Sequence, residues 1–162
     1  MYHIYDYNSP LGKMMLESDE KYLTGIWFYG GKYFGESNAK ERTERCTPVI
    51  AEAVSWLNRY FKGENPPPFS EFRMTGSDFQ VAVWKVLLSI PYGETVSYRD
   101  IALRLERERG ARMSCQAVGN AVGHNKISII IPCHRVIGTD GSLRGYAGGI
   151  DRKMALLNLE KG

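Results

Sequence analysis

The chain has 162 residues, of which 43% are apolar and 24% charged, a composition typical of one compact domain or two small ones that share a core. No apolar run approaches the roughly 18–20 residues that a membrane span needs. Residues 1–6 lack the basic flank and apolar core of a signal peptide. These features exclude a membrane-spanning chain and predict an intracellular protein, cytoplasmic if the source is prokaryotic.

The net charge of +3 is unevenly distributed, because residues 91–162 hold 11 Lys and Arg against 7 Asp and Glu. A basic C-terminal half can meet a polyanion such as DNA, although an ordinary solvated surface explains the same bias. The three cysteines are Cys46, Cys115 and Cys133. An odd number at wide spacing does not indicate a disulfide framework. Because no pair has the spacing of metal ligands, we expect reduced thiols and no metal.

The first third of the chain predicts antiparallel strands followed by a helix. Residues 14–18 and 23–28 are short β-type runs joined by a polar turn at 19–21, which is the pattern of a hairpin. An apolar stripe over residues 49–61 predicts a helix, and Pro48 suits its first turn. Three prolines at 66–68 cannot continue it, so we place a linker near 62–78. The predicted domains are residues 1–75 and 76–162.

The second half predicts four helices. They begin after Ser77 or Asp78, after Ser97, after Ser114 and near residue 151, since serine and aspartate cap helix N-termini. The second helix covers residues 98–105 and the third residues 115–123. These two short helices, separated by a charged stretch at 106–110, indicate a helix-turn-helix. The predicted fold class is therefore α+β.

The predicted helix at 115–123 is built mainly from small residues, including Ala117, Gly119, Ala121 and Gly123. Each interior glycine costs a helix about 1 kcal/mol relative to alanine. Two kinds of contact could compensate for that cost. The helix backbone could approach an external surface such as a DNA minor groove, which is only about 6 Å wide, or it could pack tightly against another helix.

Residues 127–138 are the most informative stretch. Three consecutive isoleucines at 129–131 predict a buried, extended segment, and Pro132 fixes the point at which Cys133 leaves it. A free thiol titrates near pH ~8.5, so Cys133 needs a base, and His134 stands next to it. Because neighbouring side chains of an extended chain point to opposite faces, we expect a water to bridge them.

A carboxylate beyond His134 would fix the tautomer of its ring. The sequence offers Glu160, Asp151 and Asp140 for this role. The alternative interpretation is a buried structural cysteine beside a surface histidine.

Residues 132–136 resemble the active-site signature of the O6-alkylguanine-DNA alkyltransferases. Further blocks follow in the family's order, at residues 93–98, 117–121, Asn125 and 146–149. The resemblance is strong from about Phe79 to Glu160. It is looser over the N-terminal part, where residues 9–12 and 27–28 are still similar.

The resemblance implies a small N-terminal ribonuclease-H-like domain with an antiparallel sheet, and a mostly helical, winged-helix-like C-terminal domain. It implies that Cys133 is the nucleophile and permanent alkyl acceptor, that His134 is the base through a water, and that Glu160 orients His134. Asn125 would brace the turn before the cysteine segment, and Tyr98 would rotate the nucleotide and contact the guanine.

The same resemblance gives the remaining site residues. The residues that bind the flipped guanine would be Val136, Tyr146, Ala147 and Gly148. The helix entering the minor groove would present Ser114, Cys115, Gln116, Ala117 and Gly119 to DNA. We expect Arg112 and Arg135 to bind DNA as well.

The activity implied is DNA repair by transfer of an alkyl group from O6-alkylguanine in double-stranded DNA to Cys133, once per molecule, after base flipping. O4-alkylthymine is a second candidate lesion. No cofactor, membrane or metal is implied, and a monomer is expected.

Two departures from the family pattern stand out. Family members commonly place an arginine where this chain has Gln116, and Arg112, one turn earlier, could substitute in part. The turn at 106–112 is also longer. Three rival interpretations remain: a lesion-binding protein without chemistry, like the family's alkyltransferase-like branch, a thiol hydrolase with a Cys-His-Glu site, and a helix-turn-helix regulator.

Overall fold

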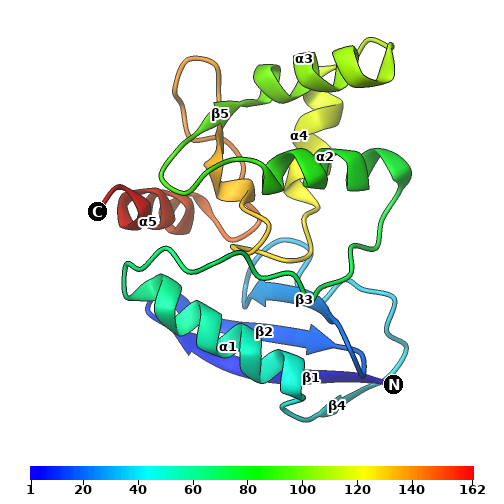
Figure 1. Cartoon of the computed structure of the whole chain (residues 1–162), viewed down its shortest axis with the longest axis vertical. Helices are drawn as coiled ribbons and strands as arrows, with labels where there is room; N and C mark the ends of the chain where they lie inside the picture. The colour runs from blue at the N-terminus through cyan, green and yellow to red at the C-terminus, as the bar shows by residue number, and fades with distance from the viewer. The chain divides into compact units, whose positions relative to one another are not determined.

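The computed structural model describes residues 1–162, which form two compact units (Figure 1). The first comprises Met1–Thr75 with Lys126–Ile130 and Gly162, and the second comprises Gly76–Asn125 with Ile131–Lys161. The predicted α+β class is confirmed. The sequence placed all of 76–162 in one domain, whereas Lys126–Ile130 belong to the first unit in the structure. No helix is both long enough and apolar enough to cross a membrane.

The first unit is built on a four-stranded sheet in the order β3-β2-β1-β4. Its strands are β1 (Tyr2–Ser9), β2 (Gly12–Ser18), β3 (Leu23–Phe28) and β4 (Arg42–Glu44). The predicted hairpin is β2–β3, and β1 joins it antiparallel. β4 pairs parallel to β1, so the sheet is mixed at that edge rather than fully antiparallel.

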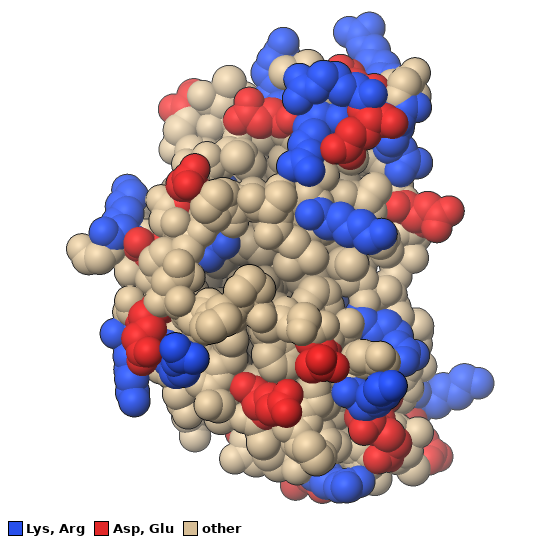
Figure 2. All heavy atoms as spheres, in the orientation of Figure 1, with Lys and Arg blue, Asp and Glu red and all other residues tan.

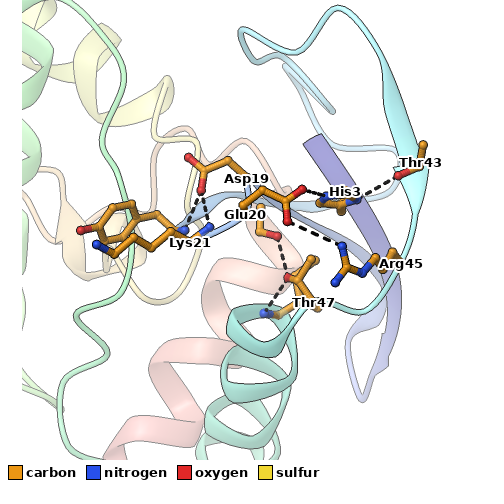
Figure 3. Close-up of polar contacts among 10 residues, drawn as sticks. His3, Asp19, Glu20, Lys21, Thr43, Arg45 and Thr47 are labelled. Atoms are coloured by element: carbon orange, nitrogen blue, oxygen red, sulfur yellow. Dashed lines mark hydrogen bonds and ion pairs between the residues drawn. The ribbon is translucent and has the colours of Figure 1, made fainter. Parts of the chain in front are cut away.

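Side chains at one end of this sheet tie its turns and edge together (Figure 3). The Asp19 carboxylate accepts the backbone N–H groups of Lys21 and Tyr22, which closes the β2–β3 turn. The ring of His3 in β1 bonds Thr43 of β4 at 2.9 Å and Glu20 of the turn at 2.7 Å.

One face of the sheet is covered by α1 (Pro48–Phe61) (Figure 1). Thr47 caps the helix and Pro48 begins it, because proline has no N–H to leave unpaired there. The Ser18 hydroxyl of β2 bonds Thr47 at 2.7 Å, which fixes the helix start on the sheet (Figure 3). The buried stripe of the helix consists of Val49, Ile50, Ala53, Leu57 and Tyr60.

The buried carboxylate of Glu17 in β2 is compensated by three donors. It accepts the Thr24 hydroxyl at 2.8 Å and the Ser37 hydroxyl at 2.9 Å, and Arg42 Nε at 2.7 Å. Arg42 also donates to the carbonyl of Gly35. A buried charge is tolerated only when paired and hydrogen-bonded, and these contacts hold the chain between β3 and β4 in place.

The second unit consists of α2 (Asp78–Leu88), α3 (Tyr98–Arg109), α4 (Cys115–Gly123) and α5 (Ile150–Lys161), with two short parallel strands, β5 (Val96–Ser97) and β6 (Val136–Ile137). Ser77, Ser97 and Ser114 cap the first three helices, as the sequence predicted. α4 packs against α2 and α3 (Figure 1). The helix-turn-helix is thus α3–α4, with α3 one turn longer than predicted and ended by Gly110 in the left-handed region.

The isoleucine segment is buried as predicted, but it is not extended. Ile129 has φ +71°, and the N–H of Ile130 donates to the carbonyl of Ser128 at 2.8 Å, which is a γ-turn that β-branched residues rarely adopt. Pro132, at φ −82° and ψ 64°, is the centre of an inverse γ-turn closed by the Cys133 N–H on Ile131 at 2.8 Å. The chain then enters a short 3₁₀ helix, η1 (Cys133–Arg135).

Candidate active site and nucleic-acid interface

Cys133 begins η1 with only 5% of its surface exposed. Burial raises the pKa of its thiol, because the charged thiolate is poorly solvated there. A hydrogen bond with Asn125 and the positive charge of Lys153 act in the opposite direction on that pKa. The site therefore holds a thiol whose ionisation depends on its polar neighbours.

Asn125 lies directly before the segment Lys126–Ile130, which belongs to the first unit, and bonds to the residue directly after it. Its side-chain amide donates to the carbonyl of Ile131 at 2.7 Å, and its own N–H donates to Val122 at the end of α4. The amide thus joins the residues on either side of Lys126–Ile130. This geometry suits the bracing role that the resemblance implies.

His134 is fully buried, and its Nε2 lies 2.6 Å from Oε2 of Glu160 in α5. Of the three candidate carboxylates, Glu160 is the one in contact, whereas Asp140 and Asp151 are exposed. Burial lowers the pKa of His134 more than Glu160 raises it, so the ring is neutral near pH 7. A neutral ring that donates Nε2–H to Glu160 has Nδ1 as its proton acceptor.

His134 follows Cys133 in the 3₁₀ helix, so their side chains point about a third of a turn apart. The premise of an extended chain was wrong, but the consequence is similar. Because the two side chains diverge, a bridging water remains the expected route for the proton.

Arg135 turns its guanidinium toward Glu160 rather than outward. Its Nε and Nη2 lie 2.7 Å and 3.0 Å from the two carboxylate oxygens, and Nη1 donates to the carbonyl of Ile90 at 2.8 Å. The N–H of Gly93 adds a further bond to Glu160 at 3.1 Å. With 11% of its side chain exposed, Arg135 differs from the sequence prediction of a DNA contact, because the buried carboxylate attracts the guanidinium inward.

The residues expected around the base lie close to this arrangement in the fold. Tyr98 begins α3, and its hydroxyl donates to the carbonyl of Arg144 at 3.0 Å. Val136 is fully buried in β6, where it pairs with Val96 of β5. Tyr146, Ala147 and Gly148 are half-buried in the segment before α5.

Lys153 of α5 is a candidate site residue that sequence reasoning missed. Its side chain is fully buried, and Nζ donates to the carbonyl of Arg144 at 2.8 Å. Burial lowers the pKa of Lys153 to about 8, while the neighbouring Cys133 acts in the opposite direction. The available signal was its spacing, since Lys153, Leu156 and Glu160 form one helical stripe and all three are buried.

The surface of α4 presents the residues expected to contact DNA. Ser114, Cys115, Gln116 and Ala117 are exposed, and so is Arg112 in the preceding turn. Beside the helix start lies a groove of about 830 Å³, lined by residues that include Arg99, Glu106, Arg112 and Cys115.

Packing within the protein does not account for the glycines of α4. A Cβ atom built on Gly119 would meet only the Tyr98 ring, at 3.8 Å, and one on Gly123 would meet nothing within 4 Å. Tight packing against another helix therefore does not explain these two glycines. The smooth surface of α4 is available for close approach by another molecule.

Basic side chains gather at the α3 end of the second unit (Figure 2). α3 carries Arg99, Arg104, Arg107 and Arg109. Arg104 pairs with Glu108 on the same helix at 3.1 Å. The helix-turn-helix thus lies in the more basic part of the molecule, which suits a polyanion.

The fold and site together define a protein that joins a buried cysteine-histidine-glutamate arrangement to a helix-turn-helix. Residues 78–162 match the model of the 6-O-methylguanine DNA methyltransferase DNA-binding domain, and residues 1–74 match the ribonuclease-like domain of the same family. The chain belongs to the 6-O-methylguanine DNA methyltransferase family, which confirms the resemblance seen in the sequence.

Individual relatives are similar to this chain over nearly its whole length. The methylated-DNA–protein-cysteine methyltransferase of Mycobacterium tuberculosis is 45% identical over 164 residues, covering 99% of this chain and 93% of the relative. That of Haemophilus influenzae is 40% identical, covering 99% and 87%. The crystal structure of M. tuberculosis OGT in complex with DNA superimposes with a TM-score of 0.83 at 44% identity, covering 99% and 92%.

Proposed function

We propose that this protein repairs DNA by direct reversal, moving a methyl or other alkyl group from O6 of guanine in duplex DNA to Sγ of Cys133. The observation that carries the proposal is the buried Cys133–His134–Glu160 arrangement in a chain of this family. The named relatives are methylated-DNA–protein-cysteine methyltransferases, which supports transfer rather than binding alone.

The chemistry follows from the protonation states of the site. Neutral His134 takes the thiol proton of Cys133 at Nδ1 through a water, and Glu160 stabilises the imidazolium that forms. The thiolate attacks the alkyl carbon, so an S–C bond forms while the C–O6 bond breaks and its electron pair goes to the guanine. The guanine takes up one proton and is restored. The thioether is inert, so each molecule acts once.

The lesion reaches Cys133 only outside the base stack, because O6 is inaccessible within the duplex. Flipping the nucleotide costs a few kcal/mol. α4 supplies the surface that enters the minor groove, since its small exposed residues admit a close backbone approach. Gln116 then faces the space left by the flipped base, and a monomer suffices for the reaction.

The three rivals predict different behaviour. A lesion-binding protein without chemistry needs no nucleophile, whereas this chain has Cys133 directly before the His134–Glu160 pair. A thiol hydrolase would turn over on esters or amides. A regulator would keep its activity in Cys133→Ala.

The experiment is intact-mass analysis after incubation with a duplex that contains one O6-methylguanine. We expect a gain of one methyl group, mapped by peptide digestion to Cys133, and none with an unmodified duplex. Cys46→Ser is the matched control that should retain transfer, since Cys46 is exposed and belongs to the first unit, outside the site. Tight lesion binding with an unmodified protein would establish the first rival instead. A duplex with O4-methylthymine tests the second lesion.

A further inference from the structure

The carbonyl oxygen of Arg144 is shared by two functional side chains from different helices. The Tyr98 hydroxyl of α3 donates to it at 3.0 Å, and the Lys153 ammonium of α5 donates to it at 2.8 Å. The same ammonium lies 5.8 Å from the centre of the Tyr98 ring. One backbone carbonyl therefore joins two helices of the second unit.

Arg144 belongs to the segment 138–149, which connects β6 to α5 without helix or strand. Three of its glycines, Gly141, Gly145 and Gly149, have positive φ, so the backbone adopts conformations that other residues rarely do. Within the segment, the N–H of Gly138 donates to Ser142 at 2.8 Å. The Arg144 carbonyl attaches this glycine-rich segment to α3 and α5.

Cys133 needs both access and charge compensation to react. Only 5% of its surface is exposed, so an alkyl carbon reaches the sulfur only after neighbouring atoms move. Tyr98 and Lys153 both interact electrostatically with Cys133. The two residues that bind the Arg144 carbonyl are thus the same two whose electrostatics are coupled to the thiol.

We propose that Tyr98 and Lys153 latch the segment 138–149 through the Arg144 carbonyl in the free protein, and that entry of the flipped nucleotide breaks this latch and leaves the Lys153 ammonium to stabilise the Cys133 thiolate. This inference rests on the proposed alkyl transfer. It makes Lys153 a positioning residue that couples base entry to activation of the sulfur.

Electrostatics favour a change of partner for the Lys153 ammonium, from the Arg144 carbonyl to the Cys133 thiolate. A buried charge requires a partner, and the Arg144 carbonyl supplies one while Cys133 is a neutral thiol. Once the thiol has given its proton to His134, the thiolate is the stronger partner, because the interaction becomes one of opposite charges. With a pKa of about 8, Lys153 carries its charge at neutral pH and loses it in mildly alkaline solution.

The charged groups near the Cys133 thiol raise or lower the pKa values of the neighbouring side chains. Lys153 and Arg135 both lower the pKa of His134, and Glu160 raises it. Burial is the main cause that raises the pKa of Tyr98; Cys133 raises it further, and Arg144 acts in the opposite direction. Lys153 is the charged side chain whose field lowers the pKa of Cys133, and Asn125 adds a neutral hydrogen bond.

The test compares Lys153→Met with Tyr98→Phe in the full-length protein by two measurements. Hydrogen exchange of the amides in 138–149 reports the latch. We expect exchange about tenfold faster in both variants, since each loses one hydrogen bond to the Arg144 carbonyl. Unchanged exchange in both variants would overturn the latch.

The second measurement is the titration of Cys133, followed by thiolate absorbance near 240 nm with Cys133→Ala subtracted to remove Cys46, Cys115 and the tyrosines. Lys153→Met should move the titration to higher pH, whereas Tyr98→Phe should not, and Lys153→Arg should restore it in part. A titration unchanged in Lys153→Met would overturn the charge role. Neither measurement uses DNA, so failure here is distinguishable from failure of alkyl transfer, which the mass experiment decides.

Discussion

The base strength of His134 is set by its immediate neighbours. Burial disfavours the imidazolium, while Glu160 at 2.6 Å favours it, and Arg135 limits that effect by pairing with the same carboxylate. The net result is a ring that is neutral at pH 7 and accepts a proton only as the thiolate forms. Arg135 and His134 thus bind the same carboxylate of Glu160.

His134→Ala should slow alkyl transfer by about 10²–10⁴-fold, the usual contribution of a general base. Single-turnover rates with the O6-methylguanine duplex measure the effect, and the affinity of the variant for DNA should change little. A nearly unchanged rate would show that Cys133 ionises without help from His134.

Lys153 should leave a signature in the pH dependence of stability. Its pKa is lowered from 10.5 to about 8 in the folded protein, so the unfolded chain binds more protons between these values. Stability contributed by this group is then fully present above pH ~10.5 and lost as the pH falls through ~8. Relative to Lys153→Met, the wild type should gain on the order of 3 kcal/mol from pH ~8 to ~10.5 in urea unfolding. A constant difference between the two proteins would mean that the lysine is not desolvated.

At this scale the sequence identified Cys133, His134, Glu160 and Asn125, because motif and family spacing mark them. Lys153 could not be predicted from its type, since an isolated lysine on a helix is usually solvated. Its burial depends on what α5 packs against, which is tertiary information.

The glycines of α4 lower its helix propensity and leave its surface smooth. Its glycines have room for a methyl group, so their cost to the helix is not offset by contacts within the protein. Under the proposed function, contact with DNA would offer the compensation.

Gly119→Ala should raise the free energy of unfolding by about 1 kcal/mol while weakening the affinity for duplex DNA several-fold. Gly123→Ala at the end of the helix is the matched control, since its Cβ also meets nothing and it lies farther from Gln116. Thermal unfolding and fluorescence anisotropy provide the two readouts. If Gly119→Ala binds DNA as tightly as the wild type, the helix does not approach DNA closely.

Gln116→Arg should preserve or improve the repair of duplex lesions, because arginine adds a charge that attracts the phosphate backbone and fills the space of the flipped base. Repair rates on duplexes, compared with rates on free O6-benzylguanine as a control for the chemistry, measure this effect. Loss of duplex repair would mean that Gln116 does not face the vacated base.

The helices were predictable because serine caps and apolar stripes are local signals, as at Ser77, Ser97 and Ser114. β4 was not, because three polar residues form a strand only by pairing with β1. The two γ-turns around Ile129 and Pro132 were also missed, since consecutive isoleucines favour an extended chain unless packing overrides it.

In the whole molecule, a single domain boundary in the sequence does not describe the two units, because Lys126–Ile130 belong to the first unit. Residues 126–130 leave the second unit and align with β3, where Ile26 exchanges backbone hydrogen bonds with Lys126 and Ser128 at 2.8 Å and 3.1 Å. Local sequence signals carry no information on such a distant pairing. Cys133 follows this segment by three residues.

The central claim is that one molecule of this protein accepts one alkyl group on one sulfur. The most direct test mixes the protein with a tenfold excess of duplex containing O6-methylguanine and counts methyl groups removed over time. We expect a plateau at one methyl per protein molecule, with all of it recovered as S-methylcysteine at Cys133. Continued removal beyond one equivalent, or methylation of Cys46 or Cys115 instead, would contradict it.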